Sequence, residues 1–346
     1  MDSGPRDRPH RLTRRSALRL LGAGTVGAAL APRILLARDE PVILGEGSHR
    51  YEWVPGWGRL PEGMSLGNTH GCVVVDGAGR IYVNTDTENA VIVFEPGGNF
   101  DRTWGADLRG GLHGMTLVKE GSEEFLWLAH TGLHEVLKTT LDGKILLRVG
   151  VPEKSGLYDS PERYRPTSVA VAPNGDVYVA DGYGLSLIHH YTAKAEFLRT
   201  WGGAGSEPGK MRTPHGIFVD TRAETPVLLV ADRENHRIQV FGLDGTVLGL
   251  VIEELRRPCN FDRRGDDIGV ADLEGRITIL GRDNRLLVHL GDNPDPAKRA
   301  QNGVPREQWK DGEFLAPHGL RFDAEGNLYV LEWLALGRIV KLRRAP

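Results

Sequence analysis

The sequence lacks several features that would place it in a common functional class. It has only two cysteines among 346 residues, and it has no Cys₂-type zinc motif, no phosphate-binding glycine loop and no G-x-S-x-G nucleophile elbow. It has no surplus of positive charge, because the formal net charge is −3. Beyond residue 37 it has no apolar run approaching the roughly 20 residues that span a bilayer. These absences argue against a nucleotide-binding P-loop, a serine-hydrolase elbow and a membrane-spanning body.

The first 37 residues have the pattern of an export signal. They hold seven Arg and two acidic residues, and the pair Arg14-Arg15 precedes a small and apolar run from Leu20 to Ala31. Leu35-Leu36-Ala37 then offers a cleavage site. A basic region, a short apolar region and a small residue at the end are typical of a secretory signal, and the arginine pair favours the twin-arginine route. We expect an exported protein, periplasmic or extracellular; the alternative is a membrane anchor left uncut.

The rest of the chain, residues 38–346, is acidic. It holds 36 basic and 44 acidic side chains, a net charge of −8. A net acidic body disfavours nucleic acid and anionic membranes as partners. We therefore expect no nucleic-acid partner and no membrane partner once the signal is cleaved. We also expect a monomer.

A unit of several short strands recurs along this body. Its best-preserved copy opens at Thr213-Pro214-His215-Gly216 and passes through Ala231-Asp232 and Arg237-Ile238 to a last strand near Leu250. Glycine is abundant, with 45 residues and no collagen-like period, as expected for a chain rich in tight turns. Repetition at roughly 40 to 50 residues with several short strands per period is the signature of a β-propeller.

Six such units follow one another, and the last stops after three strands. They begin near His70, Leu112, Pro166, Pro214, Pro258 and Pro317. The segment Tyr51 to Gly58 has no unit of its own but resembles the fourth strands that end in Trp-Gly. We predict an all-β, six-bladed propeller over residues 38–346, closed by this N-terminal strand as the outer strand of the last blade, which leaves no unpaired edge there. An open two-sheet sandwich would explain neither the six copies nor the orphan strand.

Three histidines occupy one register at the start of the inner strands. They are His113 in unit two, His215 in unit four and His318 in unit six, separated by 102 and 103 residues. On alternate blades of six they would point into the channel at about 120° to one another, a three-nitrogen set that suits Zn²⁺ with an open fourth position. His70 lies one place out of register, and we expect it at the rim. The remaining histidines lack such a relation and are expected to be solvated or structural.

The turns after the second strands carry two kinds of residue. Most contain an acid, and an acid repeated in most blades is expected to be a scaffold group that binds turn amides or the Arg of the next strand. These acids are Asp86, Asp181, Asp232, Asp272 and Glu332. Tyr183 and Arg233 differ from the pattern and are placed at the channel mouth, beside the histidines. Because the connections between blades share that face, the insertions Val151 to Arg165 and Asp292 to Leu315 are predicted to rim the mouth.

The repeats resemble NHL repeats over residues 65 to 344. Some segments resemble, more narrowly, those of peptidyl-α-hydroxyglycine α-amidating lyase, an enzyme that splits a peptide's α-hydroxyglycine end into peptide amide and glyoxylate. These segments are Leu112-His113-Gly114, Ala180-Asp181-Gly182-Tyr183, Pro214-His215-Gly216, Val230 to Asn235 and Pro317-His318-Gly319. The resemblance implies Zn²⁺ held by His113, His215 and His318, with Tyr183 as the catalytic tyrosine and Arg233 as a substrate-binding arginine.

The chain departs from that family at two places. The family has a further Arg in the first blade, where this chain reads Val83-Asn84-Thr85-Asp86-Thr87. The family also holds a structural Ca²⁺ with an Asp directly after its last zinc histidine, and here that position is Gly319. Cys72 and Cys259 lie on blades that are not neighbours, so we expect two buried thiols and no disulfide.

The residues and the resemblance together predict an exported, zinc-dependent lyase. It would cleave the C–N bond of a peptidyl-α-hydroxyglycine, or of a related carbinolamide, to amide and glyoxylate. Zn²⁺ would lower the pKa of the substrate hydroxyl, Tyr183 would take its proton, and Arg233 would hold the carboxylate. The main alternative is a non-catalytic NHL propeller that binds a partner or ligand at its channel face. A propeller lactonase ranks last, because such enzymes hold their metal mainly with carboxylate and amide side chains.

Overall fold

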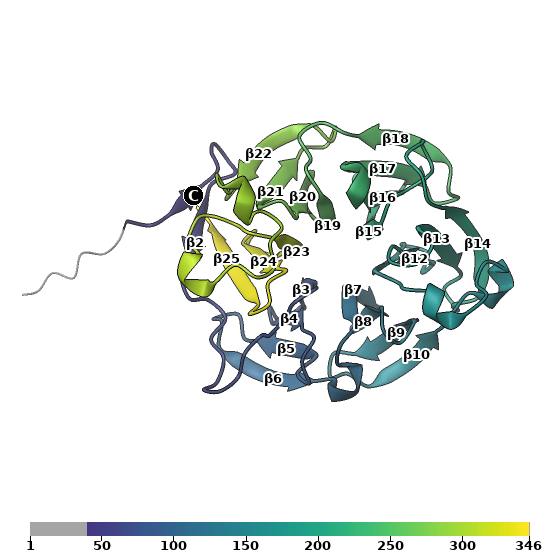
Figure 1. Cartoon of the computed structure of the whole chain (residues 1–346), viewed down its shortest axis with the longest axis horizontal. Coiled ribbons are helices and arrows are strands. Elements are labelled where there is room, and N and C mark those ends of the chain that lie inside the picture. Colours follow the sequence, from purple (N-terminus) through teal and green to yellow (C-terminus); the bar gives the residue numbers. More distant parts are fainter. Residues whose placement is uncertain (1–39, 346) are drawn as a thin grey trace, which may run out of the picture. The chain divides into compact units, whose positions relative to one another are not determined.

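The computed structural model describes residues 40–345, which form six antiparallel sheets around a central channel (Figure 1). The predicted export signal, residues 1–37, lies outside the described residues. Blade 1 consists of β3 (Val73–Val75), β4 (Ile81–Asn84), β5 (Val91–Phe94) and β6 (Phe100–Trp104). Blade 2 consists of β7 (Leu112–Glu120), β8 (Glu123–His130), β9 (Glu135–Thr140) and β10 (Ile145–Val149). Blade 3 consists of β11 (Ser168–Val171), β12 (Val177–Asp181), β13 (Leu187–Tyr191) and β14 (Phe197–Gly202).

The second half of the ring continues the same order. Blade 4 consists of β15 (Pro214–Asp220), β16 (Val227–Asp232), β17 (Arg237–Gly242) and β18 (Val247–Val251). Blade 5 consists of β19 (Pro258–Arg264), β20 (Asp267–Asp272), β21 (Arg276–Leu280) and β22 (Leu286–Leu290). Blade 6 contains β23 (Pro317–Phe322), β24 (Leu328–Glu332) and β25 (Arg338–Arg344). The predicted six-bladed, all-β propeller is confirmed, and within residues 40–345 the helices are short 3₁₀ turns.

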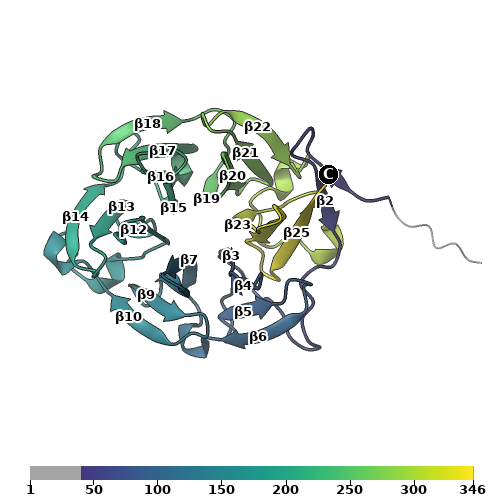
Figure 2. The same ribbon diagram turned by 180° about the vertical axis from the view of Figure 1, so that it is seen from behind.

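The N-terminal strand completes blade 6. Strand β2 (Tyr51–Val54) pairs antiparallel with β25, with Tyr51 opposite Arg344 and Val54 opposite Lys341. An additional strand that the sequence did not predict, β1 (Ile43–Leu44), pairs with β2, so this sheet has five strands. Chain segments about 290 residues apart in sequence therefore lie side by side where the ring closes, as Figure 2 shows from behind.

The hydrophobic core is divided into six clusters, one between each pair of neighbouring blades. Because both faces of each blade are covered, the middle strands are buried at every position, as in β4, β5, β12 and β13. The closing strand contributes aromatic rings to this core. Trp53 packs on Phe314 with ring centroids 5.1 Å apart, and Trp57 packs on Tyr329 at 4.9 Å. Each fully buried large apolar side chain contributes about 1.5–3 kcal/mol.

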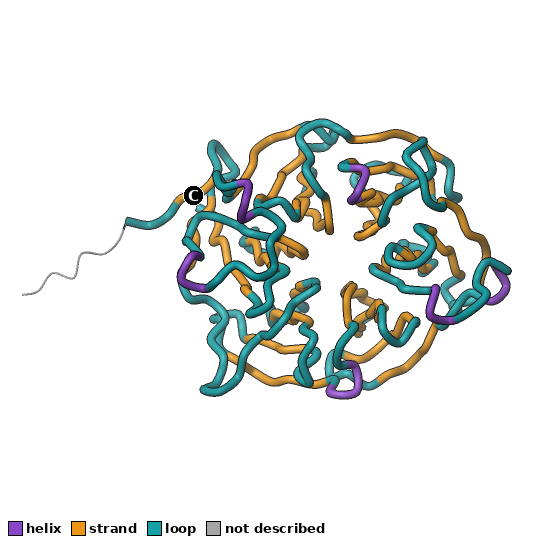
Figure 3. The backbone as a smooth tube through the Cα atoms, in the orientation of Figure 1, coloured by secondary structure: helices purple, strands orange, loops and turns teal. Residues whose placement is uncertain are grey.

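The inner strands all begin at one end of the channel, which we call the loop face. The turns after the second strands and the connections between blades lie at the same end (Figure 3). Both long insertions belong to these connections, and they contain the 3₁₀ turns η2 (Glu153–Ser155), η3 (Pro161–Arg163), η5 (Pro296–Lys298) and η6 (Arg306–Gln308). Among the residues described, none of the helices has the length and apolar character needed to cross a membrane.

Candidate metal centre and its surroundings

The three histidines of the shared register sit at irregularities in their strand pairing. On β7 the pairing passes from Leu112 to Gly114, and on β23 it passes from Pro317 to Gly319, so that one residue of each inner strand has no opposite partner. The unpaired residue is His113 on β7 and His318 on β23. On β15 the pairing shifts between Pro214 and Ile217, a stretch that includes His215. A bulge of this kind bends the strand and re-aims a side chain. Here it directs each imidazole into the channel.

The three imidazoles converge. Their ring centroids are 4.7 Å apart for His113 and His215, 5.1 Å for His113 and His318, and 4.6 Å for His215 and His318. One nitrogen from each ring lies within 4.8 Å of the other two, and all three residues are buried. This nearly equilateral arrangement, brought together from alternate blades, could bind a metal ion.

Each of these histidines is oriented by the blade that follows it. Nδ1 of His113 lies 2.7 Å from the backbone oxygen of Thr167, and Nδ1 of His215 lies 3.0 Å from that of Cys259. Nδ1 of His318 lies 3.3 Å from the backbone oxygen of Gly71. A carbonyl oxygen can only accept, so each Nδ1 carries the proton and each Nε2 keeps its lone pair for the channel. Three neutral, oriented imidazoles are the donor set that a transition-metal ion takes.

The glycine after each histidine allows this contact. A Cβ on Gly114 would lie 2.6 Å from the backbone oxygen of Thr167, and a Cβ on Gly216 or Gly319 would overlap the oxygen of Cys259 or Gly71. None of the three glycines has a positive φ, so the requirement comes from the close approach of the next blade and not from backbone conformation. The His-Gly pairs are therefore one structural unit.

Burial keeps the three imidazoles uncharged. It lowers the pKa of His113 to about 3, and the positive charge of Arg233 acts in the same direction. Burial also holds the pKa of His215 and of His318 well below the usual range. The neutral form is the one that ligates a metal, because protonation would occupy the Nε2 lone pair.

Tyr183 and Arg233 lie beside the histidine cluster, where the sequence placed them. The Tyr183 hydroxyl is 3.2 Å from Nε2 of His113 and 3.1 Å from Nε2 of His215. Arg233 contacts the same hydroxyl through Nη1 at 3.4 Å, and its guanidinium lies 5.6 Å from the centre of the Tyr183 ring. Burial raises the pKa of Tyr183, and the positive charge of Arg233 opposes this effect. The structure thus brings together all five residues that the sequence proposed for the site.

The turns that present these two side chains are fixed by the repeated acids. Asp232 accepts hydrogen bonds from the backbone of Arg212 at 2.6 Å and from Nε of Arg237 at 2.7 Å. Asp181, Asp272 and Glu332 likewise accept from backbone amides of the segment that leads into their blade. Tyr158, from the first insertion, also donates to Asp181 at 2.6 Å. The expected scaffold role is seen for these four acids.

Asp86 does not follow that expectation. It contacts two side chains, Nδ1 of His70 at 2.8 Å and Nδ2 of Asn68 at 2.6 Å, and both lie at the channel mouth. In blade 2 the position opposite Leu112 is His130, whose ring accepts from the backbone of Leu133, so a histidine replaces the acid there. Asp86 differs because it lies one residue beyond the position of the other acids, which in blade 1 is occupied by Thr85.

Asn84 is a site residue that sequence reasoning missed. It is fully buried, its Oδ1 accepts from the backbone of Cys72 at 2.6 Å, and its Nδ2 donates to the oxygens of Leu112 at 2.6 Å and His113 at 3.2 Å. A Cβ on Gly71 would overlap the Asn84 amide. The signal was an Asn where units two to five have Ala before the last residue of the second strand, but its contacts with the next blade require the folded ring.

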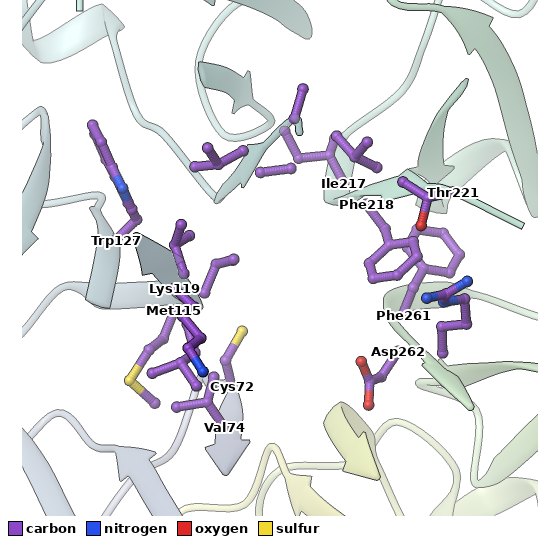
Figure 4. A pocket seen from close by; sticks show the side chains of 18 of the residues that line it. Cys72, Val74, Met115, Lys119, Trp127, Ile217, Phe218, Thr221, Phe261 and Asp262 are labelled. Carbon is purple, nitrogen blue, oxygen red and sulfur yellow. The ribbon is translucent and has the colours of Figure 1, made fainter. Parts of the chain in front are cut away.

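The channel continues below the histidines to the opposite face. A cavity of about 760 Å³ opens there, between the parts of the inner strands that follow the histidine register (Figure 4). Its wall includes Cys72, Met115, Phe218, Phe261 and Asp262, but none of the three histidines and not Tyr183. The candidate site is therefore at the loop-face end.

The two cysteines are unpaired and buried, as expected. Burial raises the pKa of Cys72 to about 11 and that of Cys259 to about 12, so both remain thiols. The calcium site implied by the resemblance has no side chain at Gly319, because a Cβ there would meet the backbone of Gly71. Among the described residues, the group of His, Cys, Asp or Glu side chains close enough to hold a metal is the histidine triad.

Comparisons with known proteins agree with this arrangement. The NHL repeat family model matches residues 164–191. The chain is 34% identical to peptidyl-alpha-hydroxyglycine alpha-amidating lyase 1 of Drosophila melanogaster over 266 residues, covering 71% of this chain and 47% of that protein. It is 28% identical to a probable lyase of the same name from Caenorhabditis elegans, covering 67% of this chain and 63% of that one. The chain thus spans about half to two thirds of the length of these relatives.

Among solved structures, a gluconolactonase from Xanthomonas campestris shares the fold. The TM-score is 0.58 at 13% identity, covering 88% of this chain and 95% of the other. Identity this low speaks for the architecture alone. The chain is therefore an NHL-repeat β-propeller homologous to the peptidyl-α-hydroxyglycine α-amidating lyases.

Proposed function

We propose that this protein is a zinc-dependent lyase that cleaves the C–N bond of a peptidyl-α-hydroxyglycine, or of a related carbinolamide, to an amide and glyoxylate. The observation that carries the proposal is the position of the Tyr183 hydroxyl, within 3.2 Å of Nε2 of both His113 and His215 and beside Arg233. A proton acceptor, a cation and three metal-ligating nitrogens then surround one point of the channel mouth. The relatives named above carry this activity in their names.

The residues fit a resident zinc ion. His113, His215 and His318 would hold it through Nε2, since each Nδ1 is bound to a carbonyl and burial keeps the rings neutral. Three histidine ligands with one open position are typical of catalytic zinc sites. When bound, the ion would supply Lewis-acid stabilisation of a hydroxyl's conjugate base.

The chain's own residues account for the rest of the reaction. The substrate hydroxyl loses its proton to the Oη of ionised Tyr183, the carbon–oxygen double bond of glyoxylate forms and the C–N bond breaks. The leaving amide nitrogen then takes that proton from Tyr183, which returns to its starting state. Because burial raises the pKa of Tyr183, the tyrosinate needs positive charge nearby, and Arg233 supplies part of it. Arg233 would bind the substrate carboxylate through Nη2, because its Nε donates to Glu234 at 2.8 Å and its Nη1 contacts Tyr183 at 3.4 Å.

We also propose that the protein acts outside the cytoplasm on peptide-derived substrates. This rests on the signal-like pattern of residues 1–37, with its Arg14-Arg15 pair. Mass spectrometry of the N-terminus of protein recovered from the periplasm or medium tests it. A chain that begins near residue 38 agrees with export, and an intact Met1 in the cytoplasmic fraction contradicts it.

Metal analysis of the purified protein tests the centre of the proposal. We expect about one zinc per chain in the wild type and none in His215→Ala, followed by glyoxylate release from an α-hydroxyglycine peptide by the wild type alone. His49→Ala is the matched control, because His49 pairs with Asp267 at 3.1 Å on the opposite face. Folded wild-type protein without a transition metal, never exposed to chelator, would leave a non-catalytic NHL binding propeller instead.

A further inference from the structure

The candidate ligands come from blades 2, 4 and 6, so the mouth has gaps between them at the intervening blades. Tyr183, on blade 3, fills the gap between His113 and His215. On blade 1, between His318 and His113, the corresponding gap holds His70. Its ring is stacked on that of His113, with ring centroids 6.2 Å apart. The mouth therefore has a second polar wall, across from Tyr183 and Arg233.

His70 is held firmly although 36% of its side chain is exposed. Nδ1 lies 2.8 Å from Oδ2 of Asp86, and the same oxygen accepts from Nδ2 of Asn68 at 2.6 Å. The ring lies close to parallel with the rings of His113 and Trp333, at interplanar angles of 22° and 23°. Four side chains thus fix the orientation of one partly exposed imidazole.

These contacts leave one ring atom of His70, Nε2, to bind a ligand. In the neutral ring Nδ1–H donates to Asp86 at 2.8 Å and Nε2 carries the lone pair, with Nδ2 of Asn68 3.4 Å from that nitrogen. An imidazole whose one nitrogen is bound to a carboxylate is a good hydrogen-bond acceptor at the other nitrogen. The carboxylate of Asp86 also repels an anionic group from this wall.

The substrate of the proposed function has three polar parts around the carbon that reacts. The hydroxyl belongs at the histidines and Tyr183, and the carboxylate belongs at Arg233, the cation in contact with Tyr183. The remaining part is the amide, which is neutral and carries an N–H donor. An acceptor beside an acid suits an amide N–H and does not suit a carboxylate.

We propose that His70, clamped by Asp86, is a substrate-binding residue that accepts a hydrogen bond from the scissile amide N–H. This assignment rests on the proposed function. It gives the site two ends, a carboxylate end at Arg233 and an amide end at His70. The site would then prefer secondary amides over tertiary amides and esters, whose corresponding atom has no hydrogen to donate.

Two measurements on the full exported protein test the assignment. The first compares KM and kcat for glyoxylate release in the wild type, His70→Ala, His70→Gln and Asp86→Asn. Loss of one hydrogen bond corresponds to about a tenfold effect. We expect KM for His70→Ala to rise about tenfold with kcat changed less, and His70→Gln, which offers Oε1 as an acceptor, to recover part of the loss. Zinc content stays at the wild-type level, and His49→Ala behaves as the wild type.

The second measurement is calorimetric binding of an N-acylglycine and of its N-methyl analogue, which needs no turnover. We expect the wild type to favour the N–H compound by about tenfold, and His70→Ala to lose that preference. If the wild type releases glyoxylate but His70→Ala keeps both its KM and the N–H preference, the assignment is wrong while the lyase stands. If the wild type releases no glyoxylate, the proposed function falls, and the assignment with it.

Discussion

Nδ1 of His215 lies 3.0 Å from the backbone oxygen of Cys259, a residue at the same register on the next blade. The same relation links His113 to Thr167 and His318 to Gly71. Alternate blades thus contribute an imidazole, and the blades between them contribute the carbonyl that orients it. The six repeated blades therefore form a site with three ligands, because three blades supply the imidazoles and the other three supply the carbonyls that orient them.

The glycine after each histidine tests this relation directly. In Gly216→Ala the new Cβ overlaps the oxygen of Cys259, so the carbonyl must move from Nδ1 of His215. We expect metal affinity to fall by about 10–100-fold, the usual effect of losing such a partner, and stability to fall by about 1–3 kcal/mol. Competition with a chelator and urea unfolding measure the two effects.

Gly249→Ala is the control for this substitution. Gly249 lies on β18 of the same blade, and its Cβ would have no neighbour within 4 Å. Equal metal affinity in Gly216→Ala and Gly249→Ala would show that the carbonyl contact is unimportant.

The hydroxyl of Tyr183 is expected to matter for turnover and not for the metal. Tyr183→Phe should keep the zinc content of the wild type, because the three imidazoles are oriented by backbone carbonyls. Its rate of glyoxylate release should fall by about 10²–10⁴-fold, the range for a general acid or base. Tyr191→Phe is the control, since this buried tyrosine of the same blade has no partner for its hydroxyl among residues 40–345. Retained turnover in Tyr183→Phe would remove the hydroxyl from the mechanism.

The closing strand should be a major source of stability. Trp53 on β2 is 3% exposed and packs on Phe314, so Trp53→Ala leaves a cavity in the cluster between blades 5 and 6. We expect a loss of about 3–5 kcal/mol in the free energy of unfolding, measured with urea. Leu248→Ala should change it by less than about 0.5 kcal/mol, because Leu248 is 57% exposed on an outer strand. Comparable losses would mean that β2 adds little to the closed ring.

The scaffold acids should affect folding and not chemistry. Asp272 is fully buried and accepts from the backbones of Arg256 and Arg257, at 2.8 and 2.5 Å, and from Arg276 at 3.4 Å. Asp272→Ala leaves two backbone amides without this acceptor and leaves Arg276 with the longer contact to Asp292, at 3.5 Å, as its carboxylate partner, so we expect a loss of about 3–5 kcal/mol. Activity per folded molecule should persist. The exposed Asp283 of the same blade serves as the control, and a stable but inactive Asp272→Ala would contradict the scaffold role.

The parts of this molecule that the sequence predicted are those constrained by the repeat. The register of the inner strands placed His113, His215 and His318 on alternate blades, and the orphan segment around Trp53 identified the closing strand. The same register also located Tyr183 and Arg233, because the turns after the second strands share one face of any propeller.

What escaped prediction depends on contacts between different blades. Asn84 looked like an ordinary strand residue until the fold placed its amide against the backbone of His113. Asp86 was grouped with the scaffold acids. Its carboxylate instead contacts Asn68 and His70, which lie in the connection before blade 1. The histidine–carbonyl pairs could not be predicted from residue types, because every residue has a backbone carbonyl. The departure at Gly319 was visible in the sequence, but the close approach of Gly71 that requires it was not.

The location of the triad on three alternate blades has a consequence for assembly. His113 and His318 are 205 residues apart, and the two intervals between the histidines each contain a complete blade that bears no ligand. No fragment of one or two blades can contain the site. A cation bound by the three histidines would link blades 2, 4 and 6 at the centre of the ring, while β2 closes the ring at its outer edge. Release of the cation and separation of β2 from β25 would then each favour the other. A chain that has bound such a cation would therefore be one whose ring has closed.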